Sequence, residues 1–390
     1  MRRPLALLLA SLLALAGCAP AAPGESFSAP DVSAFQPQPE PAPDPEPEPE
    51  PDPRQAAVDR ILSNMTLEEK VGQLFFARCP SMHAAALVSE YHLGGYILFG
   101  RDFQDKTRAE VAADIAAYQG AADLPLLIGV DEEGGTVVRV SSNPELASHR
   151  FQSPQELALA SSGQGDIFAE DAREKSGLLL GLGINVNFAP VADVSTDQAD
   201  FIHDRTLGQD AQATAGYVAS VVGAMEESYI GSVLKHFPGY GNNVDTHTGI
   251  AVDQRPYDSF ETSDFLPFEA GISAGADAVL VSHNIVTCMD GDLPASLSPE
   301  VHRVLREELG FDGVILTDDL AMDAIDQYAE TGSAAVLALQ AGNDMVLTTD
   351  FTQQIPQVLQ ALADGTLSQE VIDRAAARVL GWKYDLGLLS

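Results

Sequence analysis

The sequence is poor in basic residues, and this shortage limits what the protein can bind. Its 390 residues include 21 Lys and Arg against 57 Asp and Glu, which gives a formal net charge of -36 at pH 7. Nucleic-acid binding needs clustered Lys and Arg to neutralise phosphate groups, and the sequence has no such cluster. The composition therefore excludes a nucleic-acid-binding protein. Hydrophobic residues make up 45% of the chain, which is enough for a packed core.

Cysteine and tryptophan are also scarce, with three and one residues respectively. A module that stacks sugars on aromatic rings is not favoured, because the lone Trp382 falls in the last predicted helix and is expected in the core. Export would permit a disulfide between Cys79 and Cys288. These residues follow the first and sixth predicted strands, which are not neighbours, so free thiols are predicted.

Residues 1–17 are typical of a lipoprotein export signal. Arg2 and Arg3 supply the positive start, Leu5 to Leu15 form a short apolar core, and Leu15 to Cys18 resemble a lipobox. A membrane-spanning helix needs about 20 apolar residues, so we expect this segment to be cleaved. Cys18 would then carry a lipid that tethers the protein to the outer face of a bacterial membrane. The alternative is an ordinary secretory peptide with an incidental cysteine.

Residues 18–53 are predicted to form a disordered spacer after the lipidated cysteine. Every odd position from Pro37 to Pro53 is proline, and the residues between are mostly Glu and Asp. Such a tract stays extended as polyproline II, at about 3.1 Å per residue. It could hold a folded domain roughly 50 Å from the lipid. A docking site for a proline-binding partner is the alternative, but no aromatic or basic residue lies among the prolines.

Residues 54–390 are predicted to fold as one (β/α)8 barrel of the TIM type, an α/β fold. Apolar runs of strand length alternate with longer helical patterns, and continuous hydrophobicity is typical of parallel strands buried on both faces. Eight such units fit a closed barrel better than an open sheet. Neither G-x-G-x-x-G nor G-x-x-x-x-G-K-[ST] occurs, which disfavours nucleotide binding. The predicted strands are Val71–Phe76, Tyr96–Phe99, Leu126–Val130, Ile184–Phe188, Ser232–Leu234, Ala278–Val281, Val314–Leu316 and Met345–Leu347. The predicted helices include Lys106–Tyr118, Gln209–Glu227, Ser263–Ala274, Ser298–Glu308, Asp323–Ala341 and Ser368–Trp382.

Ionisable groups follow five of these eight strands. Because barrel enzymes place catalytic groups at the carboxyl ends of their strands, we expect these groups to share a pocket. A single acid at a strand end would more often be a helix cap. Ionisable groups at five strand ends favour a shared catalytic pocket instead. The groups are Asp131 to Glu133, Asn187 with Asp193, Lys235 with His236, His283, and Asp318 with Asp319.

Two elements of this set suggest catalytic chemistry. Asp245 and His247 lie two residues apart in a Gly-rich loop, so the carboxylate can hold the imidazole and raise its basicity, although a surface pair is an equal alternative. Asp318, kept ionised by Lys235 and Arg205 across the pocket, is suited to attack an anomeric carbon. Its rival is the next acid, which strand alternation places outside the pocket or at a helix cap.

A metal site is the competing chemistry, because His236, His247 and His283 accompany several acids. The sequence has no His-x-His strand and no His-x-x-x-His helix, so we expect no metal and no cofactor.

Taken together, these residues resemble the β-N-acetylglucosaminidases (β-N-acetylhexosaminidases) of glycoside hydrolase family 3. The resemblance covers nearly all of residues 56–385, and its motifs are specific as a set. They are Val130 to Gly135, Gly183 to Val191 with Asp193, Asp204 to Gly208, Lys235 to Gly239, Asp245 to His247, Leu293 to Ser298 and Thr317 to Met322.

The resemblance implies a retaining hydrolase that releases terminal β-N-acetylglucosamine from peptidoglycan fragments or chitooligosaccharides. Asp318 would be the nucleophile, and His247 held by Asp245 would be the acid/base. The residues implied to bind the sugar are Asp131, Arg205, Lys235, His236 and His283, the last with a less defined role. Tyr240, His203 and Thr136 depart from the usual family residues, and the first two alter loops near the pocket.

Two other functions are compatible with the motifs. A neutral histidine does not repel an incoming anion, so phosphate could replace water and make the enzyme a phosphorylase. A non-catalytic, lipid-anchored sugar-binding protein is the other alternative, although binding alone needs no nucleophile. We expect a monomer, with the lipid as its only attachment to a membrane.

Overall fold

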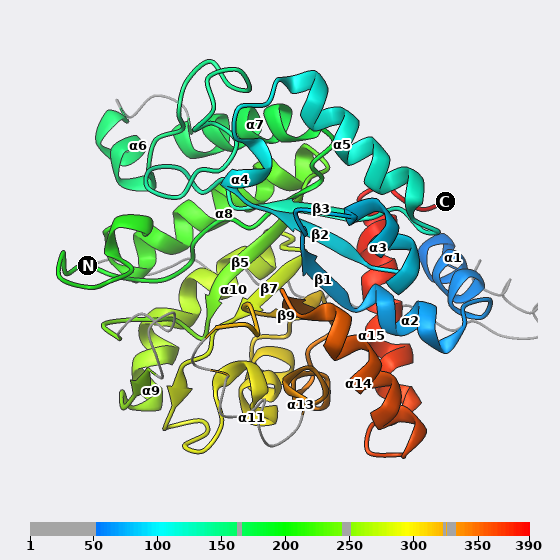
Figure 1. Cartoon of the computed structure of the whole chain (residues 1–390). Helices are drawn as coiled ribbons and strands as arrows, with labels where there is room; N and C mark the ends of the chain where they lie inside the picture. Colours follow the sequence, from blue (N-terminus) through cyan, green and yellow to red (C-terminus); the bar gives the residue numbers. More distant parts are fainter. Residues whose placement is uncertain (1–51, 162–165, 244–250, 323–324, 326–332) are drawn as a thin grey trace, which may run out of the picture. The chain divides into compact units, whose positions relative to one another are not determined.

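A computed structural model describes residues 52–161, 166–243, 251–322, 325 and 333–390. Its eight-stranded sheet is parallel, with neighbours in the order β10-β1-β2-β3-β4-β5-β7-β9 (Figure 1). A parallel bridge between Leu316 and Met345 joins the two ends of this order, which nearly closes the barrel. The strands are β1 (Phe75–Arg78), β2 (Gly95–Leu98), β3 (Leu127–Val130), β4 (Val186–Asn187), β5 (Gly231–Phe237), β7 (Ala278–Val281), β9 (Val314–Thr317) and β10 (Val346–Thr348). The predicted (β/α)8 barrel is confirmed. A separate pair, β6 (Val252–Asp253) and β8 (Ile285–Val286), is also parallel.

The first predicted strand began too early. The Thr66 hydroxyl accepts a hydrogen bond from the Glu69 backbone, and the Glu69 carboxylate accepts one from the Thr66 backbone. This capping box starts a helix, α2, which occupies Leu67–Gln73. The apolar run from Val71 to Phe76 therefore spans the end of that helix and the start of β1.

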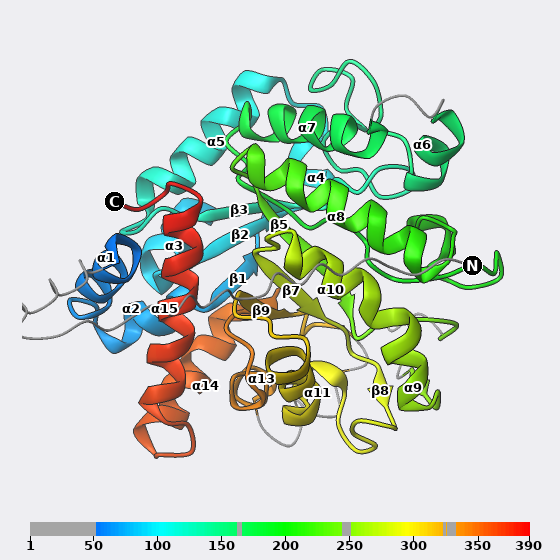
Figure 2. The ribbon, with the colours of Figure 1, turned by 180° about the vertical axis from the view of Figure 1, so that it is seen from behind.

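Helices surround the barrel in both views (Figures 1 and 2). Helix α8 packs against α7 and α10, and α1 packs against α15. The α-helices are α1 (Pro53–Leu62), α2 (Leu67–Gln73), α3 (Ala84–Tyr91), α4 (Gly100–Phe103), α5 (Arg108–Ala121), α6 (Pro154–Ala160), α7 (Ile167–Leu180), α8 (Ala211–Glu227), α9 (Tyr257–Ser259), α10 (Phe265–Ser273), α11 (Pro299–Arg303), α13 (Ala334–Ala341), α14 (Phe351–Ala363) and α15 (Gln369–Asp385). Short 3-10 turns occupy His203–Arg205 and Ala295–Leu297, and π turns occupy Phe260–Asp264 and Val304–Glu308.

Several boundaries differ from the sequence prediction. Asp52 caps α1, which starts at Pro53, so two residues assigned to the spacer belong to the folded part. The helix expected over Ser298–Glu308 is α11 followed by a π turn. Of the helix expected over Asp323–Ala341, α13 accounts for the C-terminal half, and residues 323–324 and 326–332 lie outside the described residues.

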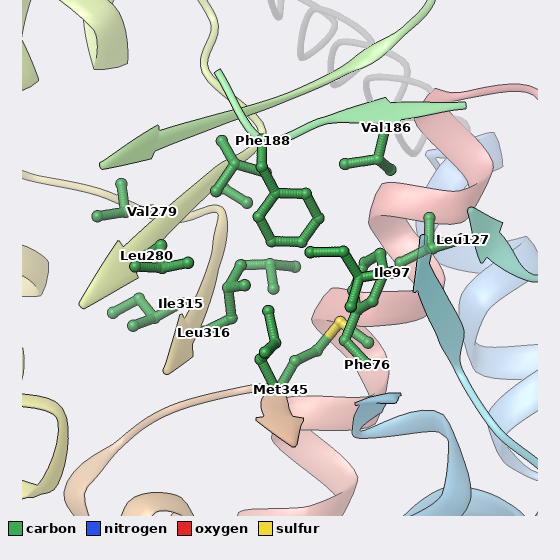
Figure 3. Packing of buried hydrophobic residues seen from close by; sticks show 14 of the residues in the cluster. Phe76, Ile97, Leu127, Val186, Phe188, Val279, Leu280, Ile315, Leu316 and Met345 are labelled. Carbon is green, nitrogen blue, oxygen red and sulfur yellow. The ribbon is translucent and has the colours of Figure 1, made fainter. Parts of the chain in front are cut away.

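The barrel interior is a packed apolar core (Figure 3). The rings of Phe76 and Phe188 meet edge to face with centroids 5.2 Å apart. Gly129 of β3 makes room for them, because a Cβ there would lie 2.5 Å from the Phe188 ring. Trp382 is buried, as predicted.

Cys79 and Cys288 are free thiols, as predicted. Burial raises the pKa of the Cys79 thiol to about 12, so this group is not a reactive thiolate at neutral pH.

The predicted export signal, Cys18 and most of the spacer lie outside the described residues. Among the helices that the structure describes, none has both the length and the apolar character needed to cross a membrane.

Candidate active site

A cavity of about 420 Å³ opens at the carboxyl ends of the barrel strands. Its floor is apolar and includes Ile97, Phe188, Leu280 and Leu347. Its walls carry charged side chains from the end of β1, from β5, from residues that follow β3 and β9, and from the loop after β4. The charged residues in the walls are Arg78, Asp131, Glu133, Arg139, Arg205, Lys235, Asp318 and Asp319. The structure therefore brings together most of the site residues predicted from the sequence.

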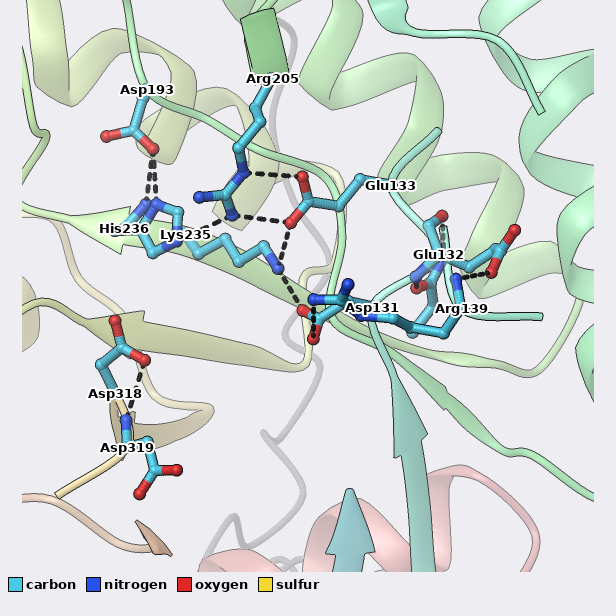
Figure 4. A network of polar contacts seen from close by, with 11 residues as sticks. Asp131, Glu132, Glu133, Arg139, Asp193, Arg205, Lys235, His236, Asp318 and Asp319 are labelled. Carbon is cyan, nitrogen blue, oxygen red and sulfur yellow. Dashed lines mark hydrogen bonds and ion pairs between the residues drawn. The ribbon is translucent and has the colours of Figure 1, made fainter. Parts of the chain in front are cut away.

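One wall is a network of ion pairs centred on Glu133 (Figure 4). Lys235 Nζ lies 2.6 Å from Asp131 Oδ1 and 2.7 Å from Glu133 Oε1. Arg205 donates from Nε to Glu133 Oε2 at 3.0 Å and from Nη2 to Oε1 at 2.8 Å. Glu133 thus joins the two cations and was not assigned a role from the sequence.

Burial alone would raise the pKa of Glu133, because its side chain is only 3% exposed. Arg205 and Lys235 outweigh burial, so the net effect lowers the pKa of Glu133 below its usual range. Burial would likewise lower the pKa of Arg205, but Glu133 reverses this effect and raises it. Glu133 and Arg205 are therefore charged at neutral pH.

Lys235 and Arg205 were predicted to keep Asp318 ionised across the pocket, and this effect stays a prediction. Their ion pairs among the described residues are with Asp131 and Glu133. Figure 4 shows Asp318 and its neighbour apart from the network. The cations are neutralised by the motif that follows β3, which precedes them in the sequence by more than seventy residues.

Asp318 follows the last residue of β9 and lines the cavity. Its backbone N donates to the carbonyl of Val281 on β7 at 2.9 Å, and its Oδ1 accepts from the Asp319 backbone at 2.8 Å. These bonds fix the carboxylate relative to two barrel strands.

Asp319 was predicted to lie outside the pocket or at a helix cap, and the first of these alternatives is wrong. Its side chain lines the same cavity, while its Oδ1 accepts from the backbone of Ala321 at 3.0 Å. The turn after β9 follows no strand alternation, so consecutive residues can face the same space. Burial raises the pKa of Asp319.

His236 is held by Asp193. Its Nδ1 and its backbone N lie 2.8 and 3.0 Å from Asp193 Oδ2, and Asp193 Oδ1 accepts from the Tyr240 backbone at 2.7 Å. Arg205 Nη2 lies 3.3 Å from Nε2 of the histidine. Because a guanidinium can only donate, Nε2 must accept and the proton resides on Nδ1. The Tyr240 ring packs edge on against His236, with centroids 5.0 Å apart.

Glu132 is buried and holds the loop that follows β3. Its carboxylate accepts backbone hydrogen bonds from Arg139 at 2.8 Å and from Val140 at 2.7 Å. Its own backbone exchanges hydrogen bonds with the Asn187 side chain at 3.0 and 3.1 Å. The three consecutive acids from Asp131 to Glu133 therefore have three different structural roles. The sequence signal was the acidic run itself, but it does not reveal which member faces which partner.

His283 is fully buried beside the end of β9 and is not among the cavity-lining residues of the described chain. Its Nδ1 lies 2.7 Å from Ser296 Oγ, and its Nε2 lies 3.1 Å from the Asp319 carbonyl oxygen. This histidine was predicted to bind substrate. In the structure it contacts the backbone of the turn that carries Asp318 and Asp319 and so supports that turn. Asp245 and His247 lie in residues 244–250, outside the described residues.

Within the described ranges, one group has metal-ligand spacing, and it consists of Glu69, His92 and Asp123. None of the three lines the cavity. The histidine Nδ1 and Asp123 Oδ2 lie 3.0 Å apart and pair with each other.

The sequence matches the family model described as "Glycosyl hydrolase family 3 N terminal domain" over residues 66–381. It is 36% identical over 313 residues to "Beta-hexosaminidase LpqI" of Mycobacterium tuberculosis, covering 77% of this chain and 78% of that protein. It is 34% identical over 299 residues to a "Beta-hexosaminidase" of Xanthomonas campestris, covering 74% and 87% respectively.

Solved structures agree. A glycoside hydrolase family 3 β-N-acetylglucosaminidase from Paenibacillus superposes with a TM-score of 0.76 at 32% identity, covering 83% of this chain and 63% of that one. The structure of LpqI superposes with a TM-score of 0.74 at 31% identity, covering 83% and 95%. The chain therefore belongs to glycoside hydrolase family 3, and it is a glycoside hydrolase.

Proposed function

We propose that this glycoside hydrolase is a β-hexosaminidase that removes terminal, non-reducing β-N-acetylglucosamine with retention of configuration. The proposed natural substrates are peptidoglycan fragments or chitooligosaccharides. The names of LpqI and of the Xanthomonas and Paenibacillus relatives support the activity. The observation that carries the mechanism is that Asp318 shares one cavity with the buried network around Glu133.

The network suits a neutral sugar ring. Lys235 Nζ lies 2.6 Å from Asp131 Oδ1, so one ring hydroxyl can accept a hydrogen bond from Lys235 and donate one to Asp131. Arg205 supplies a second donor in the same wall, and His236 accepts from Arg205 through Nε2 and so helps to orient it. Because their charges are already paired, these groups orient the ring through hydrogen bonds and place its anomeric carbon toward Asp318.

In the first step, Asp318 attacks the anomeric carbon while the bond to the leaving oxygen breaks. His247, held by Asp245, gives its proton to that oxygen, so the leaving group departs neutral. In the second step, His247 removes a proton from water, the water oxygen attacks the anomeric carbon, and the bond to Asp318 breaks. Two displacements at one carbon give net retention.

Turnover of p-nitrophenyl β-N-acetylglucosaminide tests the proposal. We expect Asp318→Ala to lower kcat by about 10⁴-fold or more and His247→Ala to lower it by about 10²-fold or more. Asp364→Asn, which changes an exposed loop acid, is the matched control and should retain the wild-type rate. Full activity in Asp318→Ala would refute the assignment of the nucleophile, and a product released first as the α anomer, seen by NMR, would refute retention.

Adding inorganic phosphate to the same assay separates hydrolysis from phosphorolysis. Water is the expected acceptor, so N-acetylglucosamine should be the product and its 1-phosphate should be absent. Abundant N-acetylglucosamine 1-phosphate would replace the hydrolase proposal with a phosphorylase. A complete lack of turnover would favour a sugar-binding protein without catalysis.

We also propose that the enzyme is exported and anchored through a lipid on Cys18, which the lipobox-like residues before it support. Cys18→Ala should move the protein from the membrane fraction to the soluble fraction. An unchanged membrane fraction would contradict the anchor without affecting the catalytic proposal.

A further inference from the structure

Among the described residues, Arg78 and Arg139 on the cavity wall have no hydrogen-bonded carboxylate, whereas Arg205 and Lys235 do. The guanidinium carbon of Arg78 lies 4.2 Å from the centre of the Phe99 ring, and that of Arg139 lies 5.7 Å from the same centre. All three side chains line the cavity that contains Asp318. Two positively charged guanidinium groups therefore lie against the same aromatic ring in one wall of the cavity.

The Nε atoms of both arginines are buried and, within the described residues, have no hydrogen-bond partner. The carboxylate paired with Arg139 is Asp131, whose Oδ2 is 3.9 Å from Nη2 and too far for a hydrogen bond. Arg205, by contrast, makes two short hydrogen bonds to Glu133. Buried donors without an acceptor are costly, and a ligand that supplies one recovers that cost.

The position of both arginines is fixed by the fold. Arg78 ends β1, and the backbone of Arg139 is bound by the buried carboxylate of Glu132. The Phe99 backbone donates to Asp102 at 2.8 Å, which anchors the ring between them. The fold thus fixes the backbone of all three residues, which lowers the cost of ordering this wall around a ligand.

We propose that Arg78 and Arg139 form a subsite for a carboxylate on the leaving group, and this inference rests on the proposed function. The network around Glu133 holds the sugar ring from the β3, β4 and β5 side, with its anomeric carbon at Asp318. Arg78, at the end of β1, and Arg139, in the loop after β3, line the same cavity and both lie against Phe99, and we place the groups attached near that carbon against this pair.

The chemistry of the pair favours an anion over a neutral group. A guanidinium presents a planar fork of donors that matches the two oxygens of a carboxylate. A hydroxyl or an acetamido carbonyl has a single oxygen and does not neutralise charge. Of the two proposed natural substrates, peptidoglycan fragments carry carboxylates next to the cleaved bond, whereas chitooligosaccharides do not. The subsite therefore favours peptidoglycan fragments.

The test compares two disaccharides that differ only in charge. In both, N-acetylglucosamine is β-linked to a leaving sugar; one leaving sugar bears a free carboxylate and the other bears its primary amide. For the wild type we expect kcat/KM to be about tenfold or more higher for the acid, the size of one charge-assisted hydrogen-bond pair. Arg78→Gln should bring this ratio close to one, and Arg78→Lys, which keeps the charge, should restore part of it.

Arg173→Gln is the control, because it removes one positive charge from an exposed ion pair with Glu227 on the outer helices. It should preserve the ratio of the wild type. A wild-type ratio near one, or a ratio that Arg78→Gln leaves unchanged, would overturn the inference.

Two further outcomes would also overturn it. If Arg78→Gln lowers the rate on the amide and on p-nitrophenyl β-N-acetylglucosaminide as much as on the acid, the arginine serves the sugar ring. If added phosphate gives N-acetylglucosamine 1-phosphate and Arg78→Gln abolishes only that product, the anion bound is the acceptor. If the enzyme cleaves the acid and the amide disaccharides at the same rate, this inference alone is wrong. If it cleaves no substrate at all, the proposed function is wrong.

Discussion

Replacing Glu133 with glutamine should destabilise the protein far more than the same change on its surface. The Glu133 side chain is 3% exposed, and its partners Lys235 and Arg205 are 3% and 18% exposed. Glutamine keeps the shape but leaves two cations without their shared counter-charge. Removing one partner of a buried ion pair typically costs about 3–5 kcal/mol. Because Lys235 retains Asp131, we expect about 3 kcal/mol.

The matched control is Glu227→Gln. Glu227 also receives a hydrogen bond from an arginine, since Arg173 Nη2 lies 2.8 Å from its Oε2. That pair is 49% and 65% exposed, so solvent screens it and its loss should cost about 0–1 kcal/mol. Urea denaturation of both variants, followed by circular dichroism, measures the two free energies of unfolding.

The difference between wild type and Glu133→Gln should also depend on pH. The folded-state pKa of Glu133 is lowered, so its contribution is complete above the unfolded-state pKa of about 4.3. It is lost as the pH falls from there toward the folded-state pKa. The difference should therefore be constant from about pH 6 to 8 and shrink below about pH 4. Equal costs for the two variants, or a difference that grows on acidification, would refute this account of the network.

Other parts of the structure yield further predictions. Asp193→Asn should lower kcat/KM about 10- to 100-fold, because His236 loses the anion that fixes its tautomer; an unchanged pH profile and rate would contradict this role. Arg205→Lys should raise KM about tenfold, because lysine cannot reproduce the two hydrogen bonds of the guanidinium fork; steady-state kinetics decide. Lys383→Met should stabilise the fold by about 2 kcal/mol at pH 7, since burial lowers the pKa of Lys383 to about 7 and the gain exceeds the lost hydrogen bond to Gln73. Wild-type stability should rise from pH 7 to 10, where the unfolded lysine binds more protons, and the variant should lack this rise.

The barrel was predictable because its strands are buried on both faces. A run such as Leu126–Val130 or Ala278–Val281 is apolar at every position, which distinguishes it from an amphipathic surface strand. The run from Val71 misled because a capping box that starts a helix stands directly before it. A helix-starting signal and an apolar run of strand length can therefore overlap at the boundary of an element. This overlap shifts the predicted boundary but does not change the order of the strands along the chain.

The location of the site was predictable, but its pairings were not. Strand ends of a parallel barrel meet at one face, so Asp131, Lys235 and Asp318 had to be near one another. Which acid meets which base depends on loop conformation and on contacts between residues more than a hundred positions apart. The roles of Glu132 and Glu133 could not be assigned for this reason. The Glu132 carboxylate binds backbone N atoms of its own loop, whereas the next residue, Glu133, lines the cavity.

The acidity of the whole chain says little about the charge that a substrate meets. The net charge is -36, yet the described residues that line the cavity include four cations and four carboxylates, which cancel formally. Arg205 and Lys235 are balanced by Asp131 and Glu133 in direct ion pairs. The other two cations face the cavity opposite no carboxylate at hydrogen-bond distance within the described chain. When Asp318 becomes esterified, its negative charge disappears while His247 gives up its proton in the same step, so the formal charge of the site does not change. The positive charge that a leaving group meets is therefore that of Arg78 and Arg139, and this local charge, rather than the net charge of the chain, decides which substrates are accepted.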